Sequence, residues 1–186
     1  MIKIMALILC LGMLTGCGAK NDSMDRAAGL RKQLLETAGC SFQTVIHADY
    51  GDTLYTFQME CTSDQTGEVK FSVTDPQTIS GVSGTVSGKK AGLVFDDTVL
   101  AFPVLAEGEL TPVVAPWIFF NTLKSGYLKA CEETDTGFCL YIDDSFEENP
   151  LHLQIYTDLD LQPEYAEIIW HERRILSLDI RNFVIV

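Results

Sequence analysis

Cysteine is the residue type in this chain with the widest scope for covalent chemistry. Two of the six cysteines, Cys10 and Cys17, belong to the apolar N-terminal stretch MIKIMALILCLGMLTGC. The other four lie in the body of the chain, at Cys40, Cys61, Cys131 and Cys139. A thiol can be acylated, can pair as a disulfide or can bind zinc. Zinc sites use closely spaced ligand pairs such as C-x-x-C, which this sequence lacks, so acylation and disulfide formation are the favoured chemistries.

Residues 1–17 have the organisation of an export signal. Lys3 gives a positive start, an apolar run follows, and the small residues Thr15 and Gly16 precede Cys17. This order resembles the lipobox of bacterial lipoproteins. The resemblance implies that residues 1–16 are a lipoprotein signal peptide and that the sulfur of Cys17 is diacylated at the start of the mature chain. The alternative is an ordinary cleaved signal in which the cysteine has no role.

Residues 17–22 then form a lipidated tether ahead of a single domain at 23–186. Each buried methylene contributes about 0.8 kcal/mol, so two or three acyl chains hold a protein stably on a membrane. We therefore expect an exported protein anchored on the extracytoplasmic face of the cell membrane. If the organism has two membranes, Gly18 after the acylated cysteine resembles an outer-membrane sorting signal.

The net charge of the chain limits the classes of partner that it can bind. Cleavage before Cys17 removes one lysine and no acid, which takes the formal net charge from −13 to −14. Such an acidic surface argues against nucleic acid and against adsorption to anionic headgroups, so the lipid on Cys17 has to supply the membrane attachment. Apolar residues are abundant enough for a packed core, and no second apolar run is long enough to span a bilayer. We expect a monomer.

The positions of the four remaining cysteines suggest two disulfides, which an exported chain can form. If Tyr50 and Gly51 make a two-residue hairpin loop, Cys40 faces Cys61 across the hairpin. Cys131 and Cys139 bracket the turn-rich segment EETDTGF and would face each other in the same way. Opposed strand positions can bring β-carbons to disulfide spacing. Free thiols are the alternative.

Other residue types give no support for catalysis or metal binding. His47, His152 and His171 share no metal-ligand spacing, and the serines lack a G-x-S-x-G context. The glycine-rich SGVSGTVSG lacks the lysine of a phosphate-binding loop, and the acidic run DDSFEEN does not have an EF-hand pattern. We expect a protein that is not an enzyme, with no catalytic residue, no metal and no cofactor.

The elements that must position these residues follow from hydrophobic periodicity. Residues 23–38 have helical spacing, and one stripe of this helix carries Met24, Ala27, Leu34, Leu35 and Ala38. From there the period becomes two, in LYTFQME, EVKFSV, LHLQIY and RILSLDIRN, which is typical of antiparallel strands with one dry and one wet face. Between 110 and 127 the pattern breaks, and Pro116 favours a short helix start. We expect an α+β fold: a curved antiparallel sheet, with an N-terminal helix and a short helical insertion on its concave face.

Taken together, the lipobox, the N-terminal helix, the strand meander, the apolar insertion and the closing DLDLQPEYAEIIWHERRILSLDIRNF resemble the superfamily of LolA and LolB lipoprotein carriers, which includes RseB and LppX. The stretch SVTDPQTISGVSGTVSGKKAGLVFDD is similar to the central strands of Gram-positive lipoproteins in this group. The resemblance covers roughly 24–184 and implies an incomplete barrel whose apolar cavity accepts acyl chains. It transfers no catalytic residue. Unlike a soluble shuttle, this chain would be tethered.

An apolar cluster around the expected insertion is the candidate ligand site. Its members are Phe102, Trp117, Ile118, Phe119, Phe120 and Leu123. One interpretation is that they line a cavity for a lipid or another hydrophobic ligand, since such sites are concave and apolar. The other is that they seal the dry face of the sheet as core. In that case the protein is a cell-envelope sensor or interaction module with a filled core, no small-molecule ligand and an envelope protein as partner.

Overall fold

The computed structural model describes residues 22–88 and 110–186. The predicted signal peptide, residues 17–21 of the predicted tether, and Phe102 lie outside the described residues, while Asp22 begins helix α2. Nine strands form one sheet in the order β4-β3-β2-β1-β9-β8-β7-β6-β5, and every neighbouring pair is antiparallel. The strands are β1 Gly39–Asp49, β2 Leu54–Asp64, β3 Val69–Asp75, β4 Ser83–Val86, β5 Tyr127–Glu133, β6 Gly137–Asp143, β7 His152–Asp158, β8 Pro163–Trp170 and β9 Arg173–Ile185.

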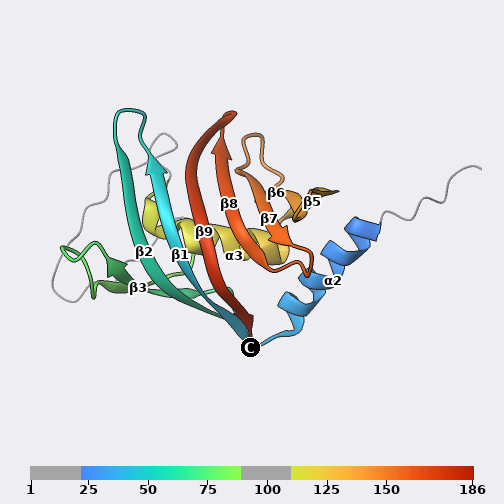
Figure 1. Cartoon of the computed structure of the whole chain (residues 1–186), viewed down its shortest axis with the longest axis horizontal. Coiled ribbons are helices and arrows are strands. Elements are labelled where there is room, and N and C mark those ends of the chain that lie inside the picture. The colour runs from blue at the N-terminus through green and yellow to red at the C-terminus, as the bar shows by residue number, and fades with distance from the viewer. Residues whose placement is uncertain (1–21, 89–109) are drawn as a thin grey trace, which may run out of the picture.

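Helices cover one face of this open, curved sheet. Helix α2 spans Asp22–Glu36, and a 3₁₀ turn, η2 at Pro112–Val114, leads into α3 at Ala115–Ser125. Figure 1 shows α3 crossing behind the strands, while α2 lies beside the β5–β7 end of the sheet. The predicted α+β class, the open antiparallel sheet and the two helices are therefore confirmed.

The alternating strand pattern separates an inner face, covered by α3, from an outer face. In β2 the buried residues are Phe57, Met59 and Cys61, with exposed residues between them. In β7 and β9, Leu153, Ile155, Leu178 and Ile180 are buried in the same way. Apolar side chains at every second position share one face of a strand, so this face becomes the core. The dry face predicted from the period-two pattern is thus confirmed at these positions, whereas Tyr55, expected on the same face as Phe57 and Met59, is 47% exposed near the end of the hairpin.

Helix α2 differs from the prediction at its C-terminal end. It ends at Glu36, and its buried residues are Ala27, Leu30 and Leu34, while Leu35 is 59% exposed. Leu30 and Leu34 are four residues apart and share a face that Leu35 cannot join. Gly39 is the first residue of β1. Glycine is needed at this position because a β-carbon would overlap the backbone of Ser63 on β2. The prediction that Leu35 and Ala38 belong to the buried stripe of this helix was therefore wrong.

The predicted hairpin register was also wrong, and the disulfides that it implied are not present. Strands β1 and β2 pair Asp49 with Leu54, which leaves Tyr50–Thr53 as the loop. The Asp49 carboxylate accepts the Gly51 N–H across 2.7 Å, and this stabilises the longer loop. Cys40 therefore lies opposite Ser63, whose Oγ is 3.1 Å from the cysteine Sγ, and not opposite Cys61.

In the β5–β6 hairpin, the pairing of the strands is shifted by one residue from the predicted register. Cys131 lies opposite Leu140, and Cys139 lies opposite Glu132. A shift of one position places two side chains on opposite faces of a sheet. Cys40, Cys61, Cys131 and Cys139 are all free, buried thiols in the structure.

Candidate functional site

The predicted ligand residues of α3 form solid core. Phe119, Phe120 and Leu123 have no exposed surface, and Ile118 is 1% exposed. A side chain that borders a space large enough for water retains some accessible surface, so Phe119, Phe120 and Leu123 border no such space within the described part of the chain. Trp117 is partly buried against the same core. The structure thus brings the described members of the predicted cluster together as packing on the inner face of the sheet.

Aromatic contacts fill the interface between α3 and the sheet. The ring of Phe119 meets Phe42 of β1 edge-on, with 5.5 Å between centroids, and Phe183 of β9 at 6.2 Å. Such edge-to-face pairs stabilise by about 0.5–1.5 kcal/mol beyond the area that they bury.

Polar contacts hold α3 at its C-terminal half. Arg31 of α2 donates to the carbonyl oxygens of Leu123, at 3.0 Å from Nε, and of Gly126. From the other side, Asn121 donates to the Gly67 carbonyl oxygen across 2.8 Å, in the β2–β3 turn. The carbonyl groups that end a helix lack partners within it, so Arg31 satisfies the end of α3, while Asn121 joins α3 to the β2–β3 turn.

Two adjoining hollows mark the opposite, outer face of the sheet. The first has a volume of about 230 Å³ and lies over β2, β1 and β9; its lining includes Gln43, Gln58, Glu60, Thr74 and Arg181. The second has a volume of about 300 Å³ and extends to β8; its lining includes His47, Asp49, Tyr165, Arg174 and Ser177. Both include Asp179 in their lining, so we treat them together as the outer groove.

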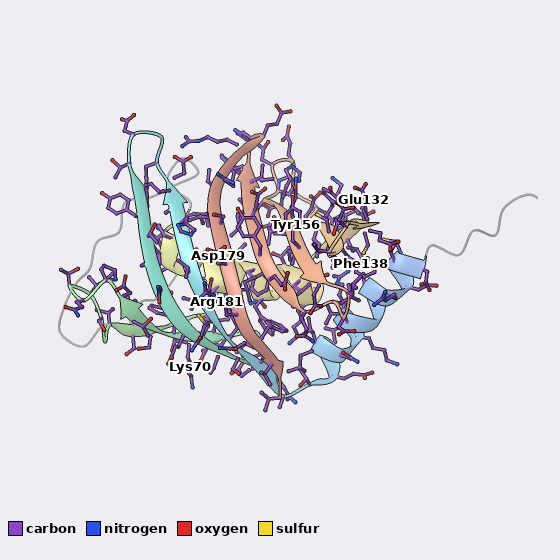
Figure 2. All side chains as sticks on the ribbon, viewed as in Figure 1. Lys70, Glu132, Phe138, Tyr156, Asp179 and Arg181 are labelled. Atoms are coloured by element: carbon purple, nitrogen blue, oxygen red, sulfur yellow. The ribbon has the colours of Figure 1, made fainter. Side chains whose placement is uncertain are left out.

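Figure 2 shows the labelled Tyr156, Asp179 and Arg181 on the near face of the sheet, with α3 behind it. The outer groove and the α3 core therefore lie on opposite faces of the same strands.

A line of three hydrogen-bonded side chains crosses the middle of the outer groove. His47 Nε2 lies 3.2 Å from Asp179 Oδ2, and its Nδ1 lies 3.0 Å from Thr56 Oγ1. A carboxylate only accepts, so in the neutral imidazole Nε2–H donates to Asp179 and Nδ1 accepts the Thr56 hydroxyl proton. This is the order of hydroxyl, base and orienting acid that activates a nucleophile. Strand β1 is paired on both sides here, so its N–H groups are committed to the sheet.

Paired polar side chains border the β8 side of the outer groove. Arg174 Nη1 donates to Glu167 Oε1 across 2.9 Å, and this hydrogen bond raises the pKa of Arg174. The Tyr165 hydroxyl donates to the same carboxylate oxygen across 3.0 Å. The ring of Tyr165 lies 5.8 Å from that of Tyr156. Burial raises the pKa of Tyr156, so this hydroxyl stays protonated at neutral pH.

Amide and charged groups border the β2 side. Gln43 donates to Glu60 across 3.3 Å and accepts from Asn182 across 3.0 Å. Among the described residues, Arg181 makes no hydrogen bond or ion pair with any of these neighbours. Its guanidinium is thus available to a ligand.

The three histidines were expected to share no metal site. His47 belongs to the outer groove, and His152 contacts the buried Asp143 at 2.6 Å beside Lys129. His171 lies in the β8–β9 turn and stacks on Trp170. Sequence reasoning missed the outer groove, although the polar residues alternating with the core pattern in β1 and β9 were a signal for it.

Within residues 22–88 and 110–186, no cluster of histidine, cysteine, aspartate and glutamate has the arrangement of a metal site. No helix in these ranges has the length and hydropathy needed to cross a bilayer.

Comparisons with known proteins find similarity in structure only. No protein-family model and no curated protein matches the sequence. The chain is similar to a LolA superfamily protein of Nitrosomonas europaea, with 10% identity, a TM-score of 0.41, and coverage of 84% of this chain and 92% of the other. A lipoprotein-sorting protein domain from Vibrio parahaemolyticus gives 10% identity, a TM-score of 0.40, and coverage of 86% and 91%.

The MucA/MucB complex of Pseudomonas aeruginosa also contains a similar chain. It gives 15% identity and a TM-score of 0.38, and the match covers 87% of this chain and 57% of that one.

Proposed function

We propose that this chain is a binding module of the cell envelope whose inner face is filled by α3 and whose outer sheet face carries the recognition surface. The burial of Ile118, Phe119, Phe120 and Leu123 is the observation that supports this most strongly. The outer groove adds unsatisfied hydrogen-bonding capacity on the other side of the same sheet. MucB, a similar structure, is known in complex with MucA, which is consistent with a binding role.

A lipid or other hydrophobic ligand under α3 is the competing function. Such a ligand would have to displace α3 and expose its apolar side chains, at a cost of roughly 1.5–3 kcal/mol for each large one. It would also break the hydrogen bonds that Arg31 and Asn121 donate. A bound acyl chain would therefore have to recover a substantial free energy before any net affinity resulted.

We propose binding rather than catalysis for the line Asp179–His47–Thr56. A nucleophilic hydroxyl needs hydrogen-bond donors for the oxyanion that forms on attack. Pairing of β1 with both β2 and β9 supports the binding role, because it leaves the N–H groups of β1 unavailable for such donation.

We also propose that the lipid on Cys17 tethers the module to the membrane. The motivation is the N-terminal order of positive residue, apolar run and Leu14-Thr15-Gly16-Cys17. Cys17→Ser should move the protein from the detergent phase to the aqueous phase in a phase-separation assay, with an unchanged thermal midpoint. Retention of the variant in the detergent phase would contradict the tether.

Titration of the full chain with a fluorescent fatty acid tests the filled inner face. We expect no saturable uptake up to roughly 100 µM, a concentration at which an 8 kcal/mol site would be filled. Arg31→Ala, which loosens α3, serves as the sensitised comparison. Saturable uptake by the wild-type chain would favour the lipid carrier over the present proposal.

A further inference from the structure

The outer groove has a nearly balanced set of charges. Its acids are Asp49, Glu60 and Asp179, and its bases are Arg174 and Arg181, with His47 as a titratable member. Asp49 is paired with Arg173 at 3.1 Å, and Asp179 is hydrogen-bonded to His47. With Arg173 and Glu167 counted as the partners of Asp49 and Arg174, four acids face three bases, so the groove carries one excess negative charge while His47 is neutral.

This balance disfavours charged ligands. A polyanion would meet three groove carboxylates on a chain of net charge −13, and it would be repelled at long range. A polycation would be drawn by that net charge but would meet the two arginines in the groove. A purely apolar ligand would desolvate these polar groups without replacing their hydrogen bonds.

The uncharged members of the lining suit a ligand rich in hydroxyl groups. Gln43 and Gln58 carry side-chain amides with donors and acceptors, of which Gln43 uses one donor on Glu60 and one acceptor on Asn182, and the Thr74 hydroxyl also donates and accepts. A hydroxyl group on the ligand both donates and accepts, so it can satisfy either kind of partner. Charged groups such as Arg181 strengthen hydrogen bonds to neutral oxygens.

Aromatic rings lie where a sugar ring could stack. Tyr165 lines the second hollow, and the Tyr156 ring is 5.8 Å away on the neighbouring strand. An aromatic face carries partial negative charge and attracts the weakly positive C–H groups of a saccharide ring. Two hollows joined at Asp179 also match a ligand made of linked units better than a single small molecule.

We propose that the outer groove binds a neutral oligosaccharide segment, of the kind that forms cell-surface glycans. This rests on the proposed function in one respect, namely that the outer face is the recognition surface. Arg181 and the two glutamines would bind hydroxyls over β1, β2 and β9, and Tyr165 would stack a sugar ring over β8.

Isothermal titration of the full chain with four neutral tetrasaccharides tests the proposal. The probes are tetra-N-acetylchitotetraose, cellotetraose, maltotetraose and mannotetraose. We expect at least one to bind with a Kd below 1 mM, and we expect Arg181→Ala and Tyr165→Ala each to weaken it at least tenfold. Tyr165→Phe should keep most of the affinity, since it retains the ring.

Matched controls lie on the same sheet but away from the groove. Lys70→Ala on β3 and Tyr127→Ala on β5 should bind as the wild type does. Cationic chitosan tetramer and anionic tetragalacturonate, used as charge controls, should bind at least tenfold more weakly than the best neutral probe.

Failure of all four neutral probes, or tighter binding of either charged probe, would overturn the saccharide proposal. Binding that survives both Arg181→Ala and Tyr165→Ala would overturn its location. None of these results depends on fatty-acid uptake, so the saccharide proposal and the filled inner face fail separately.

Discussion

The Nε–H of Arg31 donates to the carbonyl oxygen of Leu123 across 3.0 Å, and this contact joins α2 to the end of α3. The same guanidinium reaches the carbonyl oxygen of Gly126. Burial lowers the pKa of Arg31, and no carboxylate compensates for that desolvation among the contacts of its side chain. Arg31 thus holds α3 in place through helix-end carbonyls rather than through an ion pair.

Replacing Arg31 by alanine should loosen α3. Hydrogen bonds to charged groups contribute about 1.5–3 kcal/mol, so Arg31→Ala should lower the free energy of unfolding by roughly that amount. Chemical denaturation measures it. Lys32→Ala, whose exposed side chain only approaches Glu36 at 3.8 Å, should change it by less than about 0.5 kcal/mol. Equal effects of the two variants would contradict the role given to Arg31.

Gly67 should tolerate substitution less well than Gly81. Both have positive φ, 84° and 87°, so alanine is strained at each. At Gly67 the new β-carbon would also overlap the Asn121 side chain and disturb its bond to the Gly67 carbonyl oxygen, whereas space around Gly81 is open. Gly67→Ala should therefore destabilise by about 1 kcal/mol more than Gly81→Ala, measured by denaturation. A smaller loss at Gly67 would exclude the Asn121 contact as a support of α3.

The architecture could be predicted because each strand carries its own period-two pattern. Phe57, Met59, Leu153 and Leu178 identify the dry face without any knowledge of neighbouring strands. The register depends instead on loop geometry, here the Gly51 N–H bound by Asp49, and such a local bond leaves little trace in hydrophobic periodicity. That is why the pairing of Cys40 with Cys61 was wrong while the strands themselves were right.

Asp143 should make the fold sensitive to acid. Burial raises its pKa, but hydrogen bonds from Lys129 and His152 outweigh burial and leave the pKa lowered. A carboxyl group with a lowered folded pKa adds stability above its unfolded pKa of about 3.9, and this stability is lost as the pH falls through the folded pKa.

The free energy of unfolding of the wild type should therefore fall between about pH 5 and 2, and that of Asp143→Asn should fall less steeply. Equilibrium denaturation across this pH range gives both slopes. Asp135→Asn, in the exposed β5–β6 turn, is the control and should follow the wild type. If the free energy of unfolding fell equally steeply with pH in Asp143→Asn and in the wild type, Asp143 would not be a cause of the acid sensitivity.

The buried thiols should resist alkylation in the folded chain. Burial raises the pKa of Cys40 to about 11 and also raises that of Cys61. The thiolate is the reactive form, so iodoacetamide at pH 8 should label neither residue until the chain is unfolded. After unfolding without reductant, mass spectrometry should find label on Cys40, Cys61, Cys131 and Cys139. Two missing labels would reveal a disulfide that the structure lacks.

The alternating polar residues of β1 and β9 indicate a polar sheet face, but they do not indicate which side chains meet in the outer groove. His47 and Asp179 are 132 positions apart, and only the pairing of β1 with β9 brings them within 3.2 Å. The apolar cluster of α3 was visible because its members are consecutive, yet core and cavity wall use the same residue types. Only the packing of Phe119 and Phe120 distinguishes the two.

Native mass spectrometry of the mature protein, extracted from membranes with mild detergent, decides whether the inner face holds a ligand. With the inner face filled by α3, the mass should equal that of the chain with its own N-terminal acyl groups and nothing else. A further non-covalent lipid, retained by the wild type and lost from a variant with a bulkier buried residue in β1, such as Ala48→Leu, would show that the inner face holds a ligand.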